Sequence, residues 1–376
     1  MDSSSTDSTL TQSASTAGPN GTSNKVLSTQ LCELLGCRYP IIQTAMGYVA
    51  LPELVAATCN AGGFGFLAAV TIPIEEVEAA ILKTASLTNQ RFGVNFHMFT
   101  PGADKIADII LKHKDKVAAV SYGRGPNPEM IARFKQAGIA LIPTVGKTQH
   151  AIKAVKIGAD AIVVQGGEGG GHTGSAPTSI IVPQTVDAVD VPVIAAGGFK
   201  DGRGLVAALA YGAVGIAMGT RFLMTTDSPV AMAAKQRYVE VDDTDKILVT
   251  HALDGMPLRL IQNELLAKLE GQGRARALLF ALINGWQCRK ITGMSILDLL
   301  KSALVFRNDG LTATQTLMSA NAPVLYSKTW VEGKPAEGAL PGGQIAAAID
   351  ELESCEAVIQ AIMQEAQQRL DALSNK

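Results

Sequence analysis

A histidine lies among glycines in residues 165–174, which read QGGEGGGHTG and follow the apolar run 161–164. Glycine permits positive φ and lets backbone N–H groups approach a ligand closely. A histidine exchanges protons readily near neutral pH, so His172 is a candidate general base or acid. A flexible linker is also rich in glycine, but it does not usually follow an apolar strand or contain a single histidine. We therefore interpret this segment as one edge of a ligand site.

The remaining histidines and the cysteines form no comparable cluster. His97 could line the same site or be structural, whereas the other three histidines are expected on the surface or in the core. The five cysteines are scattered and contain no C-x-x-C pair, so we expect reduced thiols rather than a disulfide framework or a zinc site. No His/Asp/Glu group has ligand spacing, so no metal is expected.

Apolar runs of strand length alternate with helical patterns from residue 40 onward. The predicted strands are 41–45, 64–69, 92–96, 117–122, 140–145, 161–165, 191–196 and 215–218. The predicted helices between them include 51–60, 74–84, 104–113, 128–137, 148–157 and 203–211. Eight such units predict an α/β fold, the TIM (β/α)8 barrel. An open doubly wound sheet is the alternative, but it would carry G-x-G-x-x-G after the first strand, where this chain has TAMG at 44–47.

The candidate site residues fall where predicted strands end. Asn95 ends the third strand and Gln165 the sixth, while Gly197–Gly198 and Gly219–Thr220 follow the last two. The carboxyl ends of barrel strands form one face, and barrels commonly bind a phosphate beyond the last two strands. Each glycine alone could be an ordinary turn; together they predict a site at this face.

The pattern changes after residue 221. Helices are predicted at 258–270, 274–284 and 296–306, and a long one at 344–373. We expect a disordered tail over 1–26, the barrel over 27–250, a helical lid or substrate domain over 251–335, and a C-terminal segment and helix returning to the barrel over 336–376. Residues 268–307 contain seven basic and two acidic side chains. This excess suggests an anionic partner such as the phosphates of a coenzyme A thioester, and an ordinary solvated helix face is the alternative.

Composition excludes several classes of function. The net charge is −2 over 376 residues, so neither nucleic acid nor an anionic membrane is an expected partner. The first 24 residues are rich in Ser, Thr and Gly and lack the pattern of a signal peptide. The uncharged apolar run 205–220 is too short for a membrane span. A cytoplasmic protein with a small-molecule substrate is expected.

Five motifs resemble the flavin-binding signature of the nitronate monooxygenase (2-nitropropane dioxygenase) family, which flavin-dependent enoyl-ACP reductases share. They are QTAMG at 43–47, FGVN at 92–95, the glycine segment at 166–174, AAGGF at 195–199 and AMGTRF at 217–222. The resemblance implies an FMN-containing TIM barrel with a smaller domain over the flavin and His172 above its ring. The implied FMN contacts are Ala45, Met46, Gly47, Asn95, Gln165, Gly170, Gly171, Gly197, Gly198, Met218, Gly219, Thr220 and Gln344.

A narrower resemblance adds a substrate class. The segments 164–174, FKDGRG at 199–204 and DGMP at 254–257 are similar to the IpdC-type enzymes of bacterial steroid-ring catabolism, which are thought to act on a bicyclic acyl-CoA. This implies hydride transfer to or from FMN N5, with His172 moving the proton next to the thioester carbonyl. The alternatives are oxidation of alkyl nitronates with O2, NAD(P)H-dependent reduction of quinones or enoyl thioesters, and a non-catalytic nucleotide-binding barrel. The oligomeric state stays open, a homodimer being one option.

Overall fold

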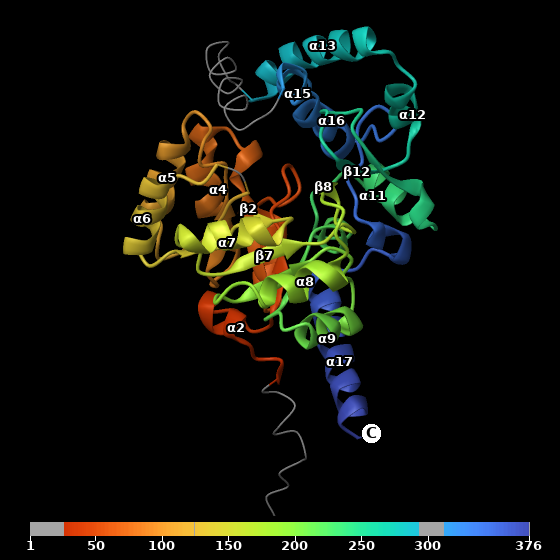
Figure 1. The fold of residues 1–376 in the computed structure, drawn as a ribbon. Coiled ribbons are helices and arrows are strands. Elements are labelled where there is room, and N and C mark those ends of the chain that lie inside the picture. Colours follow the sequence, from red (N-terminus) through yellow and green to blue (C-terminus); the bar gives the residue numbers. More distant parts are fainter. Residues whose placement is uncertain (1–25, 124, 293–311, 376) are drawn as a thin grey trace, which may run out of the picture.

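A ring of parallel strands forms the centre of the protein in a computed structural model that describes residues 26–123, 125–292 and 312–375 (Figure 1). The strands are β1 Ile41–Gln43, β2 Phe64–Ala68, β3 Phe92–Asn95, β4 Val117–Ser121, β5 Ala140–Leu141, β6 Thr144–Val145, β7 Ile162–Gln165, β9 Val193–Ala196 and β10 Ile216–Met218. Their order is β5-β4-β3-β2-β1-β10-β9-β7-β6. The two ends of this order are joined directly through Ile142 and Pro143.

The strand predicted at 140–145 is therefore divided in two. Proline has no N–H to donate to a neighbouring strand, and Pro143 lies at the break. β5 pairs with β4, and β6 pairs with β7, so this single segment closes the ring. The eight-stranded barrel predicted from the sequence is confirmed.

Helices cover the outside of the ring. They are α3 Pro52–Asn60, α4 Ile74–Leu87, α5 Ala103–Lys112, α6 Pro128–Gln136, α7 Thr148–Lys156, α8 Thr178–Val186 and α9 Gly202–Ala210, and α2 Gln30–Leu35 precedes β1. Six of these confirm predicted helices to within a few residues, and α8 follows the glycine segment. Side chains set several starts: the Asn127 side chain accepts from two N–H groups of α6, and Asp201 caps α9.

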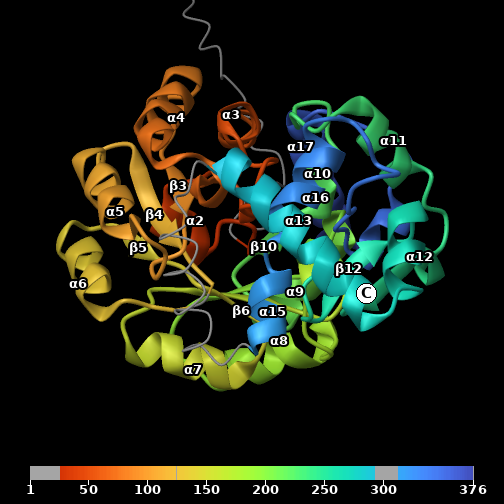
Figure 2. The same cartoon turned by 90° about the horizontal axis from the view of Figure 1, so that it is seen from above.

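A second group of elements gathers at one end of the barrel, seen from above in Figure 2. It comprises α11 Met232–Val239, β11 Ile247–Thr250, β12 Leu258–Ile261, α12 Glu264–Glu270, α13 Arg274–Thr292, α15 Ala313–Met318 and α16 Asn321–Trp330. We call these elements the lid. β12 pairs antiparallel with β11 on one side and with β8, Gly171–His172 of the glycine segment, on the other.

The helix predicted at 258–270 is wrong in its first part. Leu258 and Leu260 are buried and Arg259 between them is half-buried, so the segment has the alternation of a strand. The helix α12 begins only after Asn263, whose side chain accepts from Leu266 N. The prediction at 274–284 is confirmed by α13, and the one at 296–306 lies outside the described residues. The domain limits at 250 and 335 stay predictions.

The C-terminal segment also differs from its prediction. Gln344–Ala348 form a 3-10 turn, and the helix α17 spans Cys355–Ser374, so a single helix over 344–373 is wrong. The break arises because Ser354 is extended and its side chain caps α17 by accepting from Ala357 N. α17 packs on α9 and α3 beside the barrel (Figure 1). None of the helices within the described ranges combines the length and apolar character that crossing a membrane requires.

Candidate active site

His172 is paired with a buried carboxylate. Its Nε2 lies 2.6 Å from Oδ2 of Asp254, whose side chain is 1% exposed, whereas half of the His172 side chain is exposed. The histidine is held in β8, opposite Leu258 of β12. Asp254 was not predicted as a site residue from the sequence, because it lies 82 positions from His172. Its only indication was the DGMP motif.

The glycine segment is anchored at several points, so it is not a flexible linker. The Gln165 side chain donates to the carbonyl of His172 at 3.1 Å. Arg259 of β12 donates through Nε and Nη2 to the carbonyl of Gly167, at 3.1 and 2.8 Å. The Glu168 carboxylate accepts from the backbone N–H and the hydroxyl of Thr178 at the start of α8. Barrel, lid and α8 together fix its path.

Two glycines of this segment have contrasting surroundings: Gly170 is closely packed, whereas Gly171 borders open space. A Cβ on Gly170 would lie 2.5 Å from the backbone N of Gly343, a distance that no side chain tolerates. Gly171 has φ of 71° and no atom within 4 Å of the position of a Cβ. Gly170 is therefore a contact between two backbones, and Gly171 borders free space beside His172.

Thr220 and Gln344, both predicted cofactor residues, are linked to the glycine segment through the C-terminal segment. The Thr220 hydroxyl accepts from Gly343 N at 2.9 Å, and Gln344 N donates to the carbonyl of Glu168 at 2.9 Å. The C-terminal segment thus connects the end of β10 with the glycine segment, although it is more than 120 residues away from either.

The last two barrel strands end in adjacent glycine turns. Gly197 and Gly198 have φ of 98° and 82°, and β9, which precedes them, pairs with β10, which precedes Gly219. A Cβ on Gly219 would lie 3.1 Å from Oγ1 of Thr44 and 3.4 Å from Sδ of Met46. The end of β1 therefore adjoins the same turns. Gly197, Gly198 and Gly219 themselves carry no side chain, so their backbone N–H groups can be approached closely by an anion.

The remaining predicted cofactor residues lie on the same end of the barrel. Asn95 ends β3, and its side chain donates to the carbonyl of Ser121 at 3.1 Å. Ala45 and Gly47 belong to the turn after β1. Met218 is 3% exposed and its carbonyl accepts from Thr44 N, so only its backbone faces the turn. No cluster of metal-ligating side chains occurs in the described parts of the chain.

Arg221, within the AMGTRF motif, does not reach this place. Its guanidinium is buried and donates to the carbonyls of Met224 and Glu351, and it lies 3.7 Å from the Glu353 carboxylate. Burial lowers the pKa of this arginine. Arg221 fastens the segment before α17 to the barrel.

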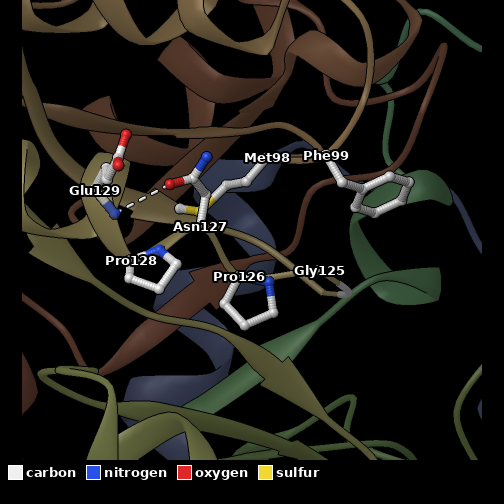
Figure 3. Close-up of a pocket in the computed structure, with 7 residues that line it drawn as sticks. All are labelled: Met98, Phe99, Gly125, Pro126, Asn127, Pro128 and Glu129. Atoms are coloured by element: carbon white, nitrogen blue, oxygen red, sulfur yellow. Dashed lines mark hydrogen bonds between the residues drawn. The ribbon is translucent and has the colours of Figure 1, made fainter. Parts of the chain in front are cut away.

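A cavity of 530 Å³ opens at the ends of β3 and β4 (Figure 3). Its lining is mixed: Met98, Phe99, Pro126 and Pro128 are apolar, whereas Asn127 and Glu129 are polar. The side chain of Asn127 is occupied in capping α6. The cavity is open and offers both apolar and polar contacts to a ligand.

The chain matches the family model "Nitronate monooxygenase" over residues 28–113 and 97–365. It is 44% identical over 92% of its length to the (3aS,4S,5R,7aS)-5-hydroxy-7a-methyl-1-oxo-octahydro-1H-indene-4-carboxyl-CoA dehydrogenase of Rhodococcus jostii, and covers 98% of that protein. It is also 44% identical to the protein of the same name from Mycobacterium tuberculosis, over 93% of this chain and 98% of the relative. A probable nitronate monooxygenase of Staphylococcus aureus is 34% identical over 64% of this chain and 80% of its own.

Solved structures of related enzymes have a similar fold. FabK from Thermotoga maritima has a TM-score of 0.75 and 28% identity, over 92% of this chain and 98% of its own. A nitroalkane oxidase from Streptomyces ansochromogenes has a TM-score of 0.72 and 26% identity, over 91% and 99%. Family and neighbours together support a flavin cofactor. The chain belongs to the nitronate monooxygenase family and is an oxidoreductase.

Proposed function

We propose that this protein is an FMN-dependent dehydrogenase of a CoA thioester derived from a steroid ring. The observation that carries the proposal is the match to two CoA-thioester dehydrogenases, which extends over nearly the whole chain and hence includes the lid. The probable nitronate monooxygenases match a smaller part of the chain. Since the lid supplies Asp254, the partner of His172, the likeness includes the elements that position the candidate base.

FMN fits the backbone surroundings described above. Gly197, Gly198, Gly219 and Thr220 would hold its phosphate, because two adjacent turns without large side chains can direct N–H groups at one anion. The ring would lie beside Gly171, whose Cβ position has no atom within 4 Å other than those of its chain neighbours. When bound, the flavin supplies the acceptor or donor of a hydride, a step for which no amino-acid side chain is equipped.

The role of the chain itself is to move a proton and to hold the substrate. A thioester carbonyl acidifies the C–H bond beside it, and a neutral histidine is suited to take that proton. His172 is half exposed next to the free space at Gly171 and is therefore accessible to a substrate. The cavity after β3 and β4, whose lining includes the apolar side chains of Met98 and Phe99, would take the substrate's rings.

Exchange of His172 for alanine tests the proposal. His172→Ala is expected to retain bound flavin, because backbone groups hold it, and to slow anaerobic flavin reduction by the acyl-CoA at least ~100-fold, the usual contribution of a general base. His150→Ala, an exposed histidine on α7, is the control and should reduce at the normal rate. An unchanged rate in His172→Ala, measured by stopped-flow absorbance, would exclude this histidine as the base.

The same preparation discriminates the other functions. Rapid O2-dependent turnover of an alkyl nitronate, with no response to acyl-CoA, would assign nitronate oxidation. Anaerobic bleaching of the flavin by NADH or NADPH would assign reduction of quinones or enoyl thioesters. A purified protein without flavin absorbance would leave only nucleotide binding.

The proposed substrate also suggests where the protein is located in the cell. We propose a cytoplasmic enzyme, because CoA thioesters are cytoplasmic metabolites and the four cysteines described by the structure are free thiols. The oligomeric state, for which a homodimer is one option, is a separate measurement by light scattering.

A further inference from the structure

Asp254 is a buried carboxylate whose two oxygens are both engaged. Oδ2 faces Nε2 of His172 at 2.6 Å, and Oδ1 accepts from the backbone N–H of Met256 at 3.0 Å. Taking a carboxylate out of water is costly unless it is hydrogen-bonded or paired. The only side chain that the structure pairs with Asp254 is that of His172, among the described residues. We therefore infer that the buried Asp254 carboxylate acts on His172.

The lid holds the segment 251–257, which carries Asp254. Asn321 at the start of α16 donates to the carbonyl of Leu253 at 2.7 Å, and its own side-chain oxygen accepts from Asn284 of α13 at 2.8 Å. Gln315 of α15 donates to the carbonyl of Gly255 at 2.9 Å. Three lid helices thus fix the carbonyls on both sides of Asp254.

The same lid also fixes the backbone of the histidine. Leu258 lies opposite His172 in the β12–β8 pair, and Thr173 N donates to the carbonyl of Pro257 at 3.3 Å. The imidazole and the carboxylate are therefore set relative to one another by a short piece of antiparallel sheet. This pairing holds the two backbones at a fixed separation, at which the hydrogen bond between the two side chains forms.

We propose that Asp254 is the positioning residue of the base: it accepts a hydrogen bond from Nε2–H of His172 and so leaves the lone pair of Nδ1 to take the substrate proton. The hydrogen bond made by one ring nitrogen decides which tautomer is present. During the reaction the C–H bond beside the thioester carbonyl breaks and its proton forms the Nδ1–H bond. Its electron pair would form the C=C bond as the neighbouring carbon loses a hydride to the flavin, the acceptor named in the proposed function. Asp254 stays ionised and stabilises the imidazolium. The inference rests on the proposed function.

The charged and titratable groups around the pair are few. Glu168 lies on the same glycine segment and is engaged with Thr178, and Arg259 of β12 is engaged with the carbonyl of Gly167. Tyr326 of α16 is buried, and burial together with the Asp254 charge raises its pKa, so it remains neutral. His251 lies exposed on the segment that carries Asp254. Asp254 is the group among these that contacts the imidazole.

Asp254→Asn removes the charge at nearly constant shape, and Asp245→Asn, an exposed lid aspartate, is the control. We expect normal flavin content in both. Flavin reduction by the acyl-CoA should slow about 10- to 100-fold in Asp254→Asn alone, less than the loss of the base itself. The acidic limb of its pH–rate profile should move to lower pH, because the imidazolium loses its counter-charge. Asp254→Glu should restore the profile toward that of the unmodified protein.

The double variant His172→Ala/Asp254→Asn separates positioning from a purely structural role. If Asp254 acts through His172, the double variant is no slower than His172→Ala. An additional 10- to 100-fold loss, or a normal rate in Asp254→Asn, would overturn the proposal. A normal rate in His172→Ala would instead overturn the proposed function. The two failures are thus distinguishable.

A measurement that leaves Asp254 in place keeps the proposal testable even if Asp254→Asn does not fold. In the purified full-length chain labelled with 15N-histidine, the NMR signals of neutral His172 should be those of the tautomer protonated at Nε2. Signals of the tautomer protonated at Nδ1 would overturn the assignment. The His172→Ala spectrum identifies the signals.

Discussion

Gly171 offers the sharpest test of where the flavin ring lies. Gly171→Ala places a methyl group in the space beside His172, where no protein atom lies within 4 Å. Gly138, between α6 and β5 at the opposite end of the barrel, is its match: its φ is 73° against 71°, and its Cβ position is equally open. The two substitutions therefore impose the same backbone strain and differ only in location.

The expected magnitudes follow from this match. Alanine in the left-handed region costs about 1–2 kcal/mol, so both variants should lose similar stability. Only Gly171→Ala should force a bound ring aside, and overpacking of a close contact typically costs about 1–3 kcal/mol. That loss corresponds to about a 5- to 150-fold weaker affinity for FMN. Gly138→Ala should bind FMN as the unmodified protein does.

Titration of flavin-free protein with FMN, followed by the quenching of flavin fluorescence, measures the affinity, and thermal unfolding measures the shared strain. An FMN affinity unchanged from that of the unmodified protein in both variants would refute the placement of the ring beside Gly171. Equal weakening in both would show that strain, rather than contact, sets the affinity. Only a selective loss in Gly171→Ala supports the reasoning.

Three further outcomes are expected. Gly202→Ala puts a Cβ 2.3 Å from the backbone of α17 and should lower the unfolding free energy by about 1–3 kcal/mol in denaturant titrations, whereas Gly123→Ala, with open space around it, should not. Glu168→Ala leaves the first turn of α8 without its acceptor and should cost about 1–2 kcal/mol, less so for Glu168→Gln, by the same measurement. Burial raises the pKa of the Cys59 and Cys355 thiols to about 12, so both should stay protonated and unreactive toward a thiol reagent as the pH rises through 9, until the protein unfolds. Labelling of either thiol in the folded protein at that pH would contradict the last expectation.

The barrel could be predicted because each of its strands and helices is indicated by the residue pattern of its own segment. The barrel strands are buried over most of their length, and β2 and β4 over all of it, so they appear in the sequence as apolar runs. The intervening helices repeat their apolar side chains with the helical period. The one division inside a predicted strand also has a local cause in Pro143. Site residues at strand ends follow from the fold itself, since parallel strands of a barrel deliver their carboxyl ends to one face.

The lid could not be predicted in the same way, because its geometry depends on distant partners. The segment 258–261 is a strand because β8 and β11 supply neighbours for it, and neither neighbour is visible in the segment's own composition. Asp254 becomes a candidate site residue because it contacts His172, and Gln344 because its backbone N–H contacts the carbonyl of Glu168. Contacts of this kind are decided by tertiary structure and leave no periodic pattern in the chain.

The sheet β11-β12-β8 joins these observations into one physical consequence. Its central strand belongs to the lid, and its edge strand is the part of the barrel loop that carries His172. Arg259 of the same central strand binds the carbonyl of Gly167, and Asp254 just before it binds the imidazole. The lid therefore does more than cover the barrel: it fixes the backbone, the ring orientation and the hydrogen-bonding partner of the candidate base. We therefore expect a chain lacking an ordered lid to keep the glycine turns after β9 and β10 but to lose the fixed pairing of His172 with Asp254.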